Sequence, residues 1–455
     1  MSTRGRTARG HTVSRARGRT MRSPTPGQPH WAQVGDRVIS WTTAGHRSGT
    51  PDERAGDLFL VTQVGRAFQD EHPEVRPVLD HGRHLVVEHL DPSLVTATTC
   101  WRAEPLPENQ VVVDVPQVQA ARRRDPATDE LLSSLSPATY DDDVTWLASL
   151  PTRHSTSGGF MQAADWAATR LAATGCDVTR MPVPVGAGQS QNVIGDRPAP
   201  GEAAADLVIV TAHLDSVNAA GGPSAPAPGA DDNASGCAGV LALAEALGAR
   251  TWASDLRLVL FGGEEQGLIG STRYVASLPT AERQRVRAVL NMDMIATRNT
   301  PTPAVLIEGA AVSTALIDDL VAAAGTYTAL RVETSLSPFA SDHVPFIDAG
   351  MPALLTIEGA DSANGNVHTA QDTLDHLDHG LALEILRMNL AALAGWLGPA
   401  MSSPRPAGSV VARAAGRLDV FALGPGGTML HKSWDGERWL PGVTEYADLG
   451  RPPVG

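Results

Sequence analysis

The sequence predicts an α/β protein with a mixed, mostly parallel central sheet and helices on both faces of that sheet. Between residues 128 and 400, short and continuously apolar segments alternate with segments of helical periodicity. This alternation is typical of buried strands and amphipathic helices in one layered domain. The flanking segments lack it, so we expect a small N-terminal β-rich or α+β region at 31–125 and a short C-terminal β segment within 401–455.

The composition supports a packed core and excludes several classes of protein. Hydrophobic residues make up 42% of the 455 residues, and the formal net charge is −14. A nucleic-acid-binding protein is usually basic, so nucleic acid is not an expected partner. Three cysteines cannot form a disulfide framework. The longest apolar runs are shorter than the roughly 18 residues that a transmembrane helix needs, so no transmembrane segment is expected.

The first 125 residues carry no recognisable chemistry. Residues 1–30 form an arginine-rich stretch without an apolar run, so we expect a disordered tail and see no secretory signal. Short strand-like runs punctuated by Pro, Gly and Asp follow in 31–125. This region is interpreted either as a pro-segment or as a separate domain, and an exposed linker around 122–126 separates it from the next domain.

The expected elements of the central domain can be placed in order along the chain. Helical spacing of apolar residues predicts helices around 163–171, 240–247, 317–324 and 381–397. Continuous apolar runs predict buried strands between them, at 207–211, 256–261, 286–290, 305–307 and 353–357. After a Ser/Pro/Gly linker at 402–408, alternating apolar residues predict two or three short antiparallel strands between 418 and 434.

Acidic and histidine residues follow four of these expected strands. Taken singly, His213 reads as a loop residue, Asp232 as a helix cap, and Glu264 and Glu265 as a solvated pair. Asp293 is different, because a carboxylate at the end of an apolar strand needs a partner. Ligands of an open α/β sheet bind beyond the carboxyl ends of its strands, so the coincidence of these residues indicates a site there.

The residue types indicate a hydrolytic metal centre. His213 and His368, with Glu265, Asp293 and one of the adjacent Asp231 and Asp232, provide nitrogen and oxygen ligands without cysteine, which suits zinc. Two histidines and three carboxylates suffice for two metal ions if one carboxylate bridges them. The mechanism also needs a general base, and Glu264 stands beside the candidate ligand Glu265.

The motifs AHLDS, PGADDNASG, GEEQGLIGS, NMDM and HTAQDT resemble those of the M28 family of co-catalytic zinc metallopeptidases, especially bacterial leucyl-type aminopeptidases. The resemblance covers roughly 130–400 and implies a zinc-exopeptidase-like domain that binds two zinc ions per chain and acts on peptides. His213, Asp232 and Asp293 would hold one ion, and Asp232, Glu265 and His368 the other. Glu264 would be the general base, and Asp215 would orient the imidazole of His213.

One departure from the family concerns the oxyanion. Members often carry a tyrosine beside the last histidine or before a Ser-Asp-His segment. Here Val367 precedes His368, and residues 335–340 contain no tyrosine. The oxyanion-stabilising group is therefore not identified.

Three alternatives to the aminopeptidase remain open. A glutaminyl cyclase would use the same fold with a single zinc ion, and a non-catalytic receptor-like protein would use the fold without chemistry. Residues 409–446 resemble one repeat of a lectin-like β-propeller, so glycan binding through Trp434 and Trp439 is the third, although strand aromatics are the simpler interpretation. The family is commonly secreted, but the sequence leaves the compartment, the preferred N-terminal residue and the oligomeric state undecided.

Because every candidate ligand lies between 213 and 368, the sequence also predicts that a fragment of about residues 128–400 keeps activity.

Overall fold

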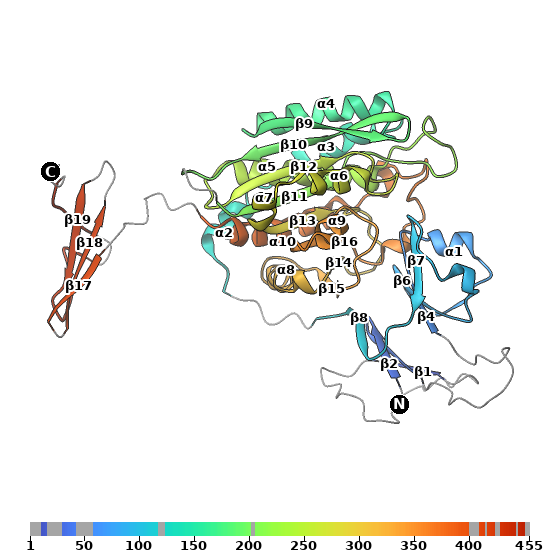
Figure 1. The fold of residues 1–455 in the computed structure, drawn as a ribbon, viewed down its shortest axis with the longest axis horizontal. Helices are drawn as coiled ribbons and strands as arrows, with labels where there is room; N and C mark the ends of the chain where they lie inside the picture. Colours follow the sequence, from blue (N-terminus) through green and yellow to red (C-terminus); the bar gives the residue numbers. More distant parts are fainter. Residues whose placement is uncertain are drawn as a thin grey trace.

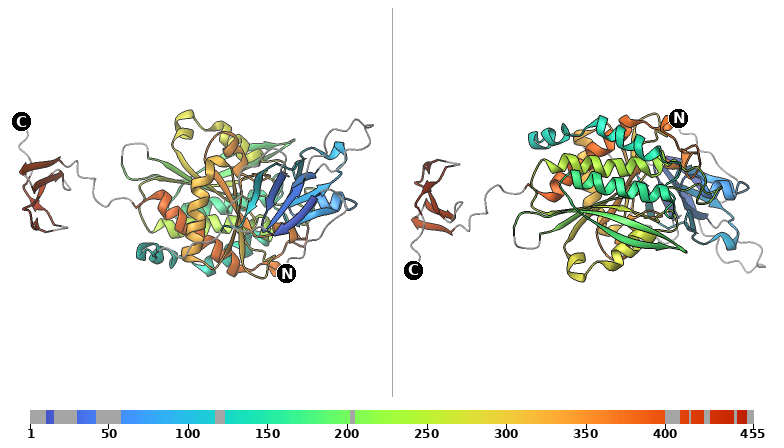
Figure 2. Two further views of the ribbon diagram at one scale, coloured as in Figure 1. Left: turned by 90° about the horizontal axis from the view of Figure 1, so that it is seen from below. Right: turned by 90° about the horizontal axis from the view of Figure 1, so that it is seen from above.

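The structure is a computed structural model, and its described residues are 11–15, 30–41, 58–116, 123–201, 205–399, 409–414, 416–423, 428–442 and 445–450. A twelve-stranded mixed sheet runs through the main body of the molecule, with helices on both of its sides (Figures 1 and 2). This architecture confirms the predicted α/β fold class.

The large sheet has the strand order β1-β3-β2-β8-β15-β14-β16-β13-β11-β12-β10-β9. Its strands from residue 177 onward are β9 (Asp177–Val185), β10 (Gly188–Arg197), β11 (Leu207–His213), β12 (Asp255–Phe261), β13 (Val286–Met292), β14 (Ala304–Gly309), β15 (Arg331–Ser335) and β16 (Ala353–Glu358). Strands β12, β11, β13 and β16 are mutually parallel, whereas β10 and β14 run antiparallel to their neighbours β12 and β16. The centre of the sheet is therefore parallel, as the apolar runs predict.

The two faces of the sheet are covered by different helices. Val208 and Val210 of β11 pack into a large core with one set of helices, and Leu207 and Ile209 pack into a smaller core on the opposite face. The first set comprises α2 (Pro126–Leu132), α3 (Pro137–Ala148), α4 (Gly158–Ala173), α5 (Gly236–Gly248), α8 (Thr314–Tyr327) and α10 (His379–Leu397). The opposite face carries α6 (Ile269–Ser277), α7 (Thr280–Gln284) and α9 (His343–Asp348).

Helix α10 is the only described helix that could span a membrane by length and composition, with a mean hydropathy of 1.3 over its apolar window. Its Leu386, Leu390 and Leu393 are buried in the large core, in contact with other helices of the same face. The helix therefore packs here as the core helix of an α/β domain.

The N-terminal region divides between two sheets. Its elements are β1 (His11–Arg15), β2 (His30–Val34), β3 (Arg37–Trp41), β4 (Leu58–Gln63), α1 (Ala67–Glu71), β5 (Pro77–His81), β6 (His84–Glu88), β7 (Trp101–Pro105) and β8 (Gln110–Asp114). Strands β5, β6, β4 and β7 form a separate four-stranded sheet. Strands β1, β3, β2 and β8 instead extend the large sheet, because β8 pairs with β15 through Thr334 and Ser335.

The predicted disordered tail needs one correction. Residues 11–15 form β1, whose backbone pairs with all five residues of β3. The pairing satisfies backbone N–H and C=O groups of residues 11–15. The composition of the segment could not reveal this partner strand. The rest of the 1–30 tail, apart from His30 in β2, lies outside the described residues, as does the linker at 402–408.

The C-terminal segment forms a five-stranded sheet of its own. It contains β17 (Ser409–Ala414), β18 (Arg417–Leu423), β19 (Met429–Trp434), β20 (Trp439–Leu440) and β21 (Ala447–Asp448). The described strands pair antiparallel and only with one another. Figures 1 and 2 both show this sheet apart from the main body.

Candidate metal centre

The register of the parallel strands brings the candidate residues to one edge of the sheet. His213 at the end of β11 pairs with Phe261 at the end of β12, so the loop with Glu264 and Glu265 starts at the same level. Thr211 pairs with Asn291 of β13, which places Asp293 beside His213. Asp232 lies in the irregular turn that precedes α5, and His368 lies in a loop beyond β16. All five expected ligands meet at this edge.

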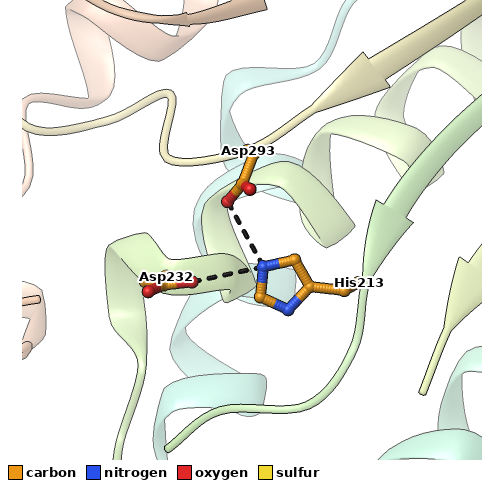
Figure 3. A group of neighbouring side chains, drawn as sticks. All are labelled: His213, Asp232 and Asp293. Carbon is orange, nitrogen blue, oxygen red and sulfur yellow. Dashed lines mark hydrogen bonds and ion pairs between the residues drawn. The ribbon is translucent and has the colours of Figure 1, made fainter. Parts of the chain in front are cut away.

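His213, Asp232 and Asp293 form the first group of candidate ligands (Figure 3). The Nε2 atom of His213 lies 3.2 Å from Oδ1 of Asp232 and 3.3 Å from Oδ1 of Asp293. All three residues are buried, and their ligand atoms lie within 4.8 Å of one another. One cation could contact an atom of each.

Asp232, Glu265 and His368 form the second group. The Nε2 atom of His368 lies 3.1 Å from Oδ2 of Asp232 and 3.0 Å from Oε2 of Glu265. The two carboxylate oxygens of Asp232 thus face different histidines. The second oxygen of Glu265, Oε1, is buried without a hydrogen-bond partner among the described residues. A buried carboxylate oxygen needs a positive partner, and a bound cation would supply one.

The electrostatics favour positive charge at this edge. Burial alone would lower the pKa of His213, but the carboxylates of Asp293 and Glu264 raise that pKa well above its usual value. Burial would raise the pKa of Asp232, yet His213 and His368 hold it well below its usual range. The cluster therefore binds protons tightly at the histidines, and cations could replace those protons.

Glu264 stands apart from the two groups. Its carboxylate forms no hydrogen bond with a described residue, and the side chain lines the cavity that contains the candidate ligands. Burial raises the pKa of Glu264 well above its usual value, and the nearby carboxylates of Asp342 and Glu265 add to this. Burial also raises the pKa of Glu265, to about 7. Glu264 thus lies at the cavity beside both groups, with a raised affinity for a proton.

Asp215 contacts the site differently from the expectation. The imidazole Nδ1 of His213 lies 3.2 Å from the backbone carbonyl oxygen of Asp215 and 3.8 Å from its carboxylate. The carboxylate instead accepts hydrogen bonds from the backbone N–H groups of Glu264 and Glu265, at 3.3 and 3.2 Å. The backbone of Asp215 therefore orients the imidazole, while its side chain fixes the turn that carries both glutamates.

Two residues that hold candidate ligands were not assigned from the sequence. The hydroxyl of Ser341 donates to Oδ2 of Asp293 at 2.6 Å. The carboxylate of Asp372 accepts from the backbone N–H groups of Asp231 and Asp232, both at 2.9 Å. Asp372 lies four residues after His368 within the quoted motif HTAQDT, so its closeness to that ligand was an available signal. Ser341 lies 48 positions from Asp293 and had no such signal.

The candidate ligands open onto a cavity of about 300 Å³. Part of its wall comes from the N-terminal region, in which the sequence revealed no chemistry. That part consists of Val64, Thr98, Thr99, Cys100 and Arg102. The sequence left the role of residues 31–125 undecided, because contacts between segments distant in sequence leave no local motif.

Backbone strain is concentrated around the cavity. Four cavity residues other than glycine have positive φ angles: Leu268 at 56°, Met294 at 52°, Ala340 at 45° and His368 at 59°. Such conformations are costly, and they cluster at functional sites where the surrounding structure enforces them. Among the described residues no tyrosine lines the cavity, so the oxyanion-stabilising group expected by family resemblance has no tyrosine candidate here.

Comparisons with known proteins identify the family. Residues 192–393 match peptidase family M28. Leucine aminopeptidase 1 of Arthroderma otae is 30% identical over 278 residues, which are 56% of this chain and 72% of that protein. Aminopeptidase YwaD of Bacillus subtilis is 30% identical over 191 residues, 41% of this chain but only 40% of that relative.

The solved structures agree in fold. The aminopeptidase from Aneurinibacillus sp. strain AM-1 superimposes with a TM-score of 0.52 at 17% identity, covering 60% of this chain and 97% of its own. The LapB structure from Legionella pneumophila gives a TM-score of 0.55 at 17% identity and covers 75% of this chain and all of its own. From the five converging side chains, the match to the family motifs and the similarity to Leucine aminopeptidase 1, we conclude that this chain belongs to peptidase family M28.

Proposed function

We propose that this protein is an aminopeptidase that uses two zinc ions to remove N-terminal residues from peptides. The observation that carries the proposal is the position of Asp232, whose two oxygens face His213 and His368 separately. Two groups of three ligands therefore share one carboxylate. Histidine and carboxylate ligands without cysteine suit zinc, and relatives named aminopeptidases support the reaction class.

The donor set fits two ions. His213, Asp232 and Asp293 would hold one, and Asp232, Glu265 and His368 the other. When bound, the ions would polarise the scissile carbonyl group and lower the pKa of a water molecule. The unpartnered Oε1 of Glu265 supports this assignment, because it would otherwise remain buried without a positive partner.

Glu264 would move the proton. As the water oxygen bonds to the carbonyl carbon, the Glu264 carboxylate accepts a proton from that water. It then donates the proton to the leaving amine as the C–N bond breaks. The carboxylate of Asp215 accepts a hydrogen bond from the backbone N–H group of Glu264. The backbone that carries Glu264 is therefore fixed, and the Glu264 side chain is preorganised for both steps.

Two adjacent substitutions test the assignment. Glu264→Gln should leave both zinc ions in place and lower kcat by about 10²–10⁴-fold with little change in KM, because it removes only the proton transfer. Glu265→Gln should lower zinc affinity, since a neutral amide is a poor ligand. Elemental analysis of the dialysed proteins and leucyl-anilide kinetics measure both effects.

The pair is its own matched control, because the two substitutions are chemically identical and one residue apart. If Glu264→Gln loses zinc while Glu265→Gln keeps it, the two roles are reversed. If neither substitution slows turnover, the metallopeptidase proposal is wrong.

A further inference from the structure

The cavity over the candidate ligands has an unusual charged residue on its N-terminal wall. Its other charged and histidine lining residues are candidate ligands or the proposed base: His213, Asp232, Glu264, Glu265, Asp293 and His368. Arg102 is the only arginine or lysine among the described lining residues. Two divalent ions would balance the four carboxylates, so the guanidinium of Arg102 would remain as a positive charge facing the cavity.

The wall that carries Arg102 is fixed in place by buried contacts. Arg83, between β5 and β6, is 2% exposed and forms ion pairs with Glu308 at 3.3 Å and Asp361 at 3.2 Å. Its Nη2 atom also donates to the carbonyl oxygen of Phe339, a residue of the facing cavity wall. The N-terminal sheet is therefore anchored to the central domain beside the cavity.

Contacts with neighbouring residues orient the side chain of Arg102, but some of its N–H groups make no hydrogen bond with a described residue. Its guanidinium lies over the ring of Phe339, 5.2 Å from the centroid, and Nη2 donates to Oγ of Ser337 at 3.2 Å. Its nearest acid is Glu104, at 3.6 Å and half-exposed, which makes a weak pair. No described residue accepts a hydrogen bond from Nη1. Nε is buried, so Nη1 and the second N–H of Nη2 are the groups that remain for a ligand, and the planar guanidinium fork suits a carboxylate.

We propose that Arg102 binds a carboxylate of the substrate, so that the enzyme acts preferentially on short peptides that carry a negative charge beyond the scissile bond. This inference rests on the proposed aminopeptidase function and names its substrate class. The cavity of about 300 Å³ lies at the lower end of the range for small-molecule sites and suits a di- or tripeptide. The carboxylate could be the peptide C-terminus or an acidic side chain.

Three substrates with the same N-terminal residue test the proposal: Leu-Gly, Leu-Gly-amide and Leu-Glu-amide. The zinc-loaded full chain should cleave Leu-Gly with a kcat/KM about 10- to 100-fold above that of Leu-Gly-amide, mainly through KM, as expected for charge-assisted hydrogen bonds. A preference for Leu-Glu-amide over Leu-Gly-amide would identify an acidic side chain as the source. Equal rates on all three substrates would overturn the proposal.

Substitutions then connect the preference to this residue. Arg102→Met keeps the aliphatic stem over Phe339 and should abolish the acid-to-amide preference, whereas Arg102→Lys should keep part of it. Arg66→Met is the matched control, because Arg66 belongs to the same region and pairs with Asp70 on the surface. The ratio of two rates in one preparation does not depend on how much protein folds. A preference that survives Arg102→Met would also overturn the proposal.

The failure of the proposed function can be recognised separately. If leucyl-anilide and all three peptides resist hydrolysis, the aminopeptidase proposal fails and this inference fails with it. If leucyl-anilide is cleaved while the acid and amide peptides behave alike, only the role of Arg102 is wrong. Calorimetric titration of zinc-loaded Glu264→Gln protein with Leu-Gly and Leu-Gly-amide gives a readout without turnover, and the acid should bind more tightly.

Discussion

The two β-rich regions that flank the central domain look alike in sequence but differ in structure. Both are short, and neither carries a catalytic motif. In the N-terminal region, β8 pairs with β15 of the large sheet, Arg83 is buried against Glu308, and the turn before β7 lines the cavity. The described C-terminal strands pair only among themselves, and the ion pair of His431 with Asp419 joins two of them.

The difference teaches how a flanking segment becomes part of a site. In sequence, both regions show short strand-like runs between turn-forming residues, so this pattern does not decide the outcome. Two features instead tie a flanking region to the central domain: strand pairing at the edge of the large sheet and one buried charged side chain. If the region is removed, the first leaves backbone N–H and C=O groups unpaired and the second leaves carboxylates without their arginine. We therefore expect the N-terminal region to be required for activity and the C-terminal sheet to be dispensable.

The largest effect should come from deleting each flank. A fragment of residues 123–399 would expose the edge of β15 and leave Glu308 and Asp361 buried without their arginine. We expect at least a roughly hundredfold loss of kcat/KM or failure to fold, whereas residues 1–399 should stay within about twofold of the full chain. This reverses the sequence-based expectation for a fragment of about 128–400. Leucyl-anilide kinetics and thermal unfolding of both fragments measure these effects. Full activity of the 123–399 fragment would show that the N-terminal region is not required.

A single pair of arginine substitutions sharpens the same contrast. Arg83→Met leaves the buried carboxylates of Glu308 and Asp361 without their arginine, although His343 stays 3.4 Å from Glu308. It should lower the free energy of unfolding by about 3–5 kcal/mol. Arg438→Met, in the C-terminal sheet, removes an ion pair between Asp435 and a side chain that is 77% exposed. This substitution should change the free energy of unfolding by no more than about 0.5 kcal/mol. Urea unfolding curves measure both.

A control addresses the cause of the Arg83 effect. Adding Glu308→Gln and Asp361→Asn to Arg83→Met should restore part of the lost stability, because the uncompensated charges are gone. Similar losses for Arg83→Met and Arg438→Met would show that the buried anchor does not distinguish the two regions.

The smallest effect concerns a thiol on the cavity wall. Cys100 is partly exposed and lines the cavity, whereas Cys176 and Cys237 are buried, and burial raises the pKa of Cys237 to about 12. A maleimide should therefore modify Cys100 first and lower the rate by about tenfold, by occupying the substrate space. The matched control is Ser433→Cys on β19 in a Cys100→Ser background, where modification should leave the rate unchanged. If maleimide lowered the rates of the two proteins equally, Cys100 would not lie on the wall of the substrate cavity.

The parts of the fold predicted from the sequence share a physical origin. Strands β11, β12 and β13 are buried on both faces, so each reads as a continuous apolar run, and the ligands follow directly where those runs end. The hairpin of β9 and β10 was missed. Strand β9 lies at the sheet edge, is mostly exposed and contains two prolines, so its sequence carries little periodicity.

The parts of the site that were missed depend on contacts between distant segments. Arg83 meets Glu308 across 225 positions, and Arg102 meets Ser337 across 235. An arginine of the N-terminal region has no local feature that marks it as buried or as part of a cavity wall. The pairing of β8 with β15 and the buried contacts of Arg83 bring these segments together, and no motif encodes either.

Zinc content is the measurement that tests the central claim most directly. The purified full chain, loaded with zinc and dialysed, should contain about two zinc ions by elemental analysis. Asp232→Ala should lose zinc from both groups, because it removes the carboxylate that faces His213 and His368 at once. One zinc ion per wild-type chain, or two ions retained by Asp232→Ala, would contradict the account.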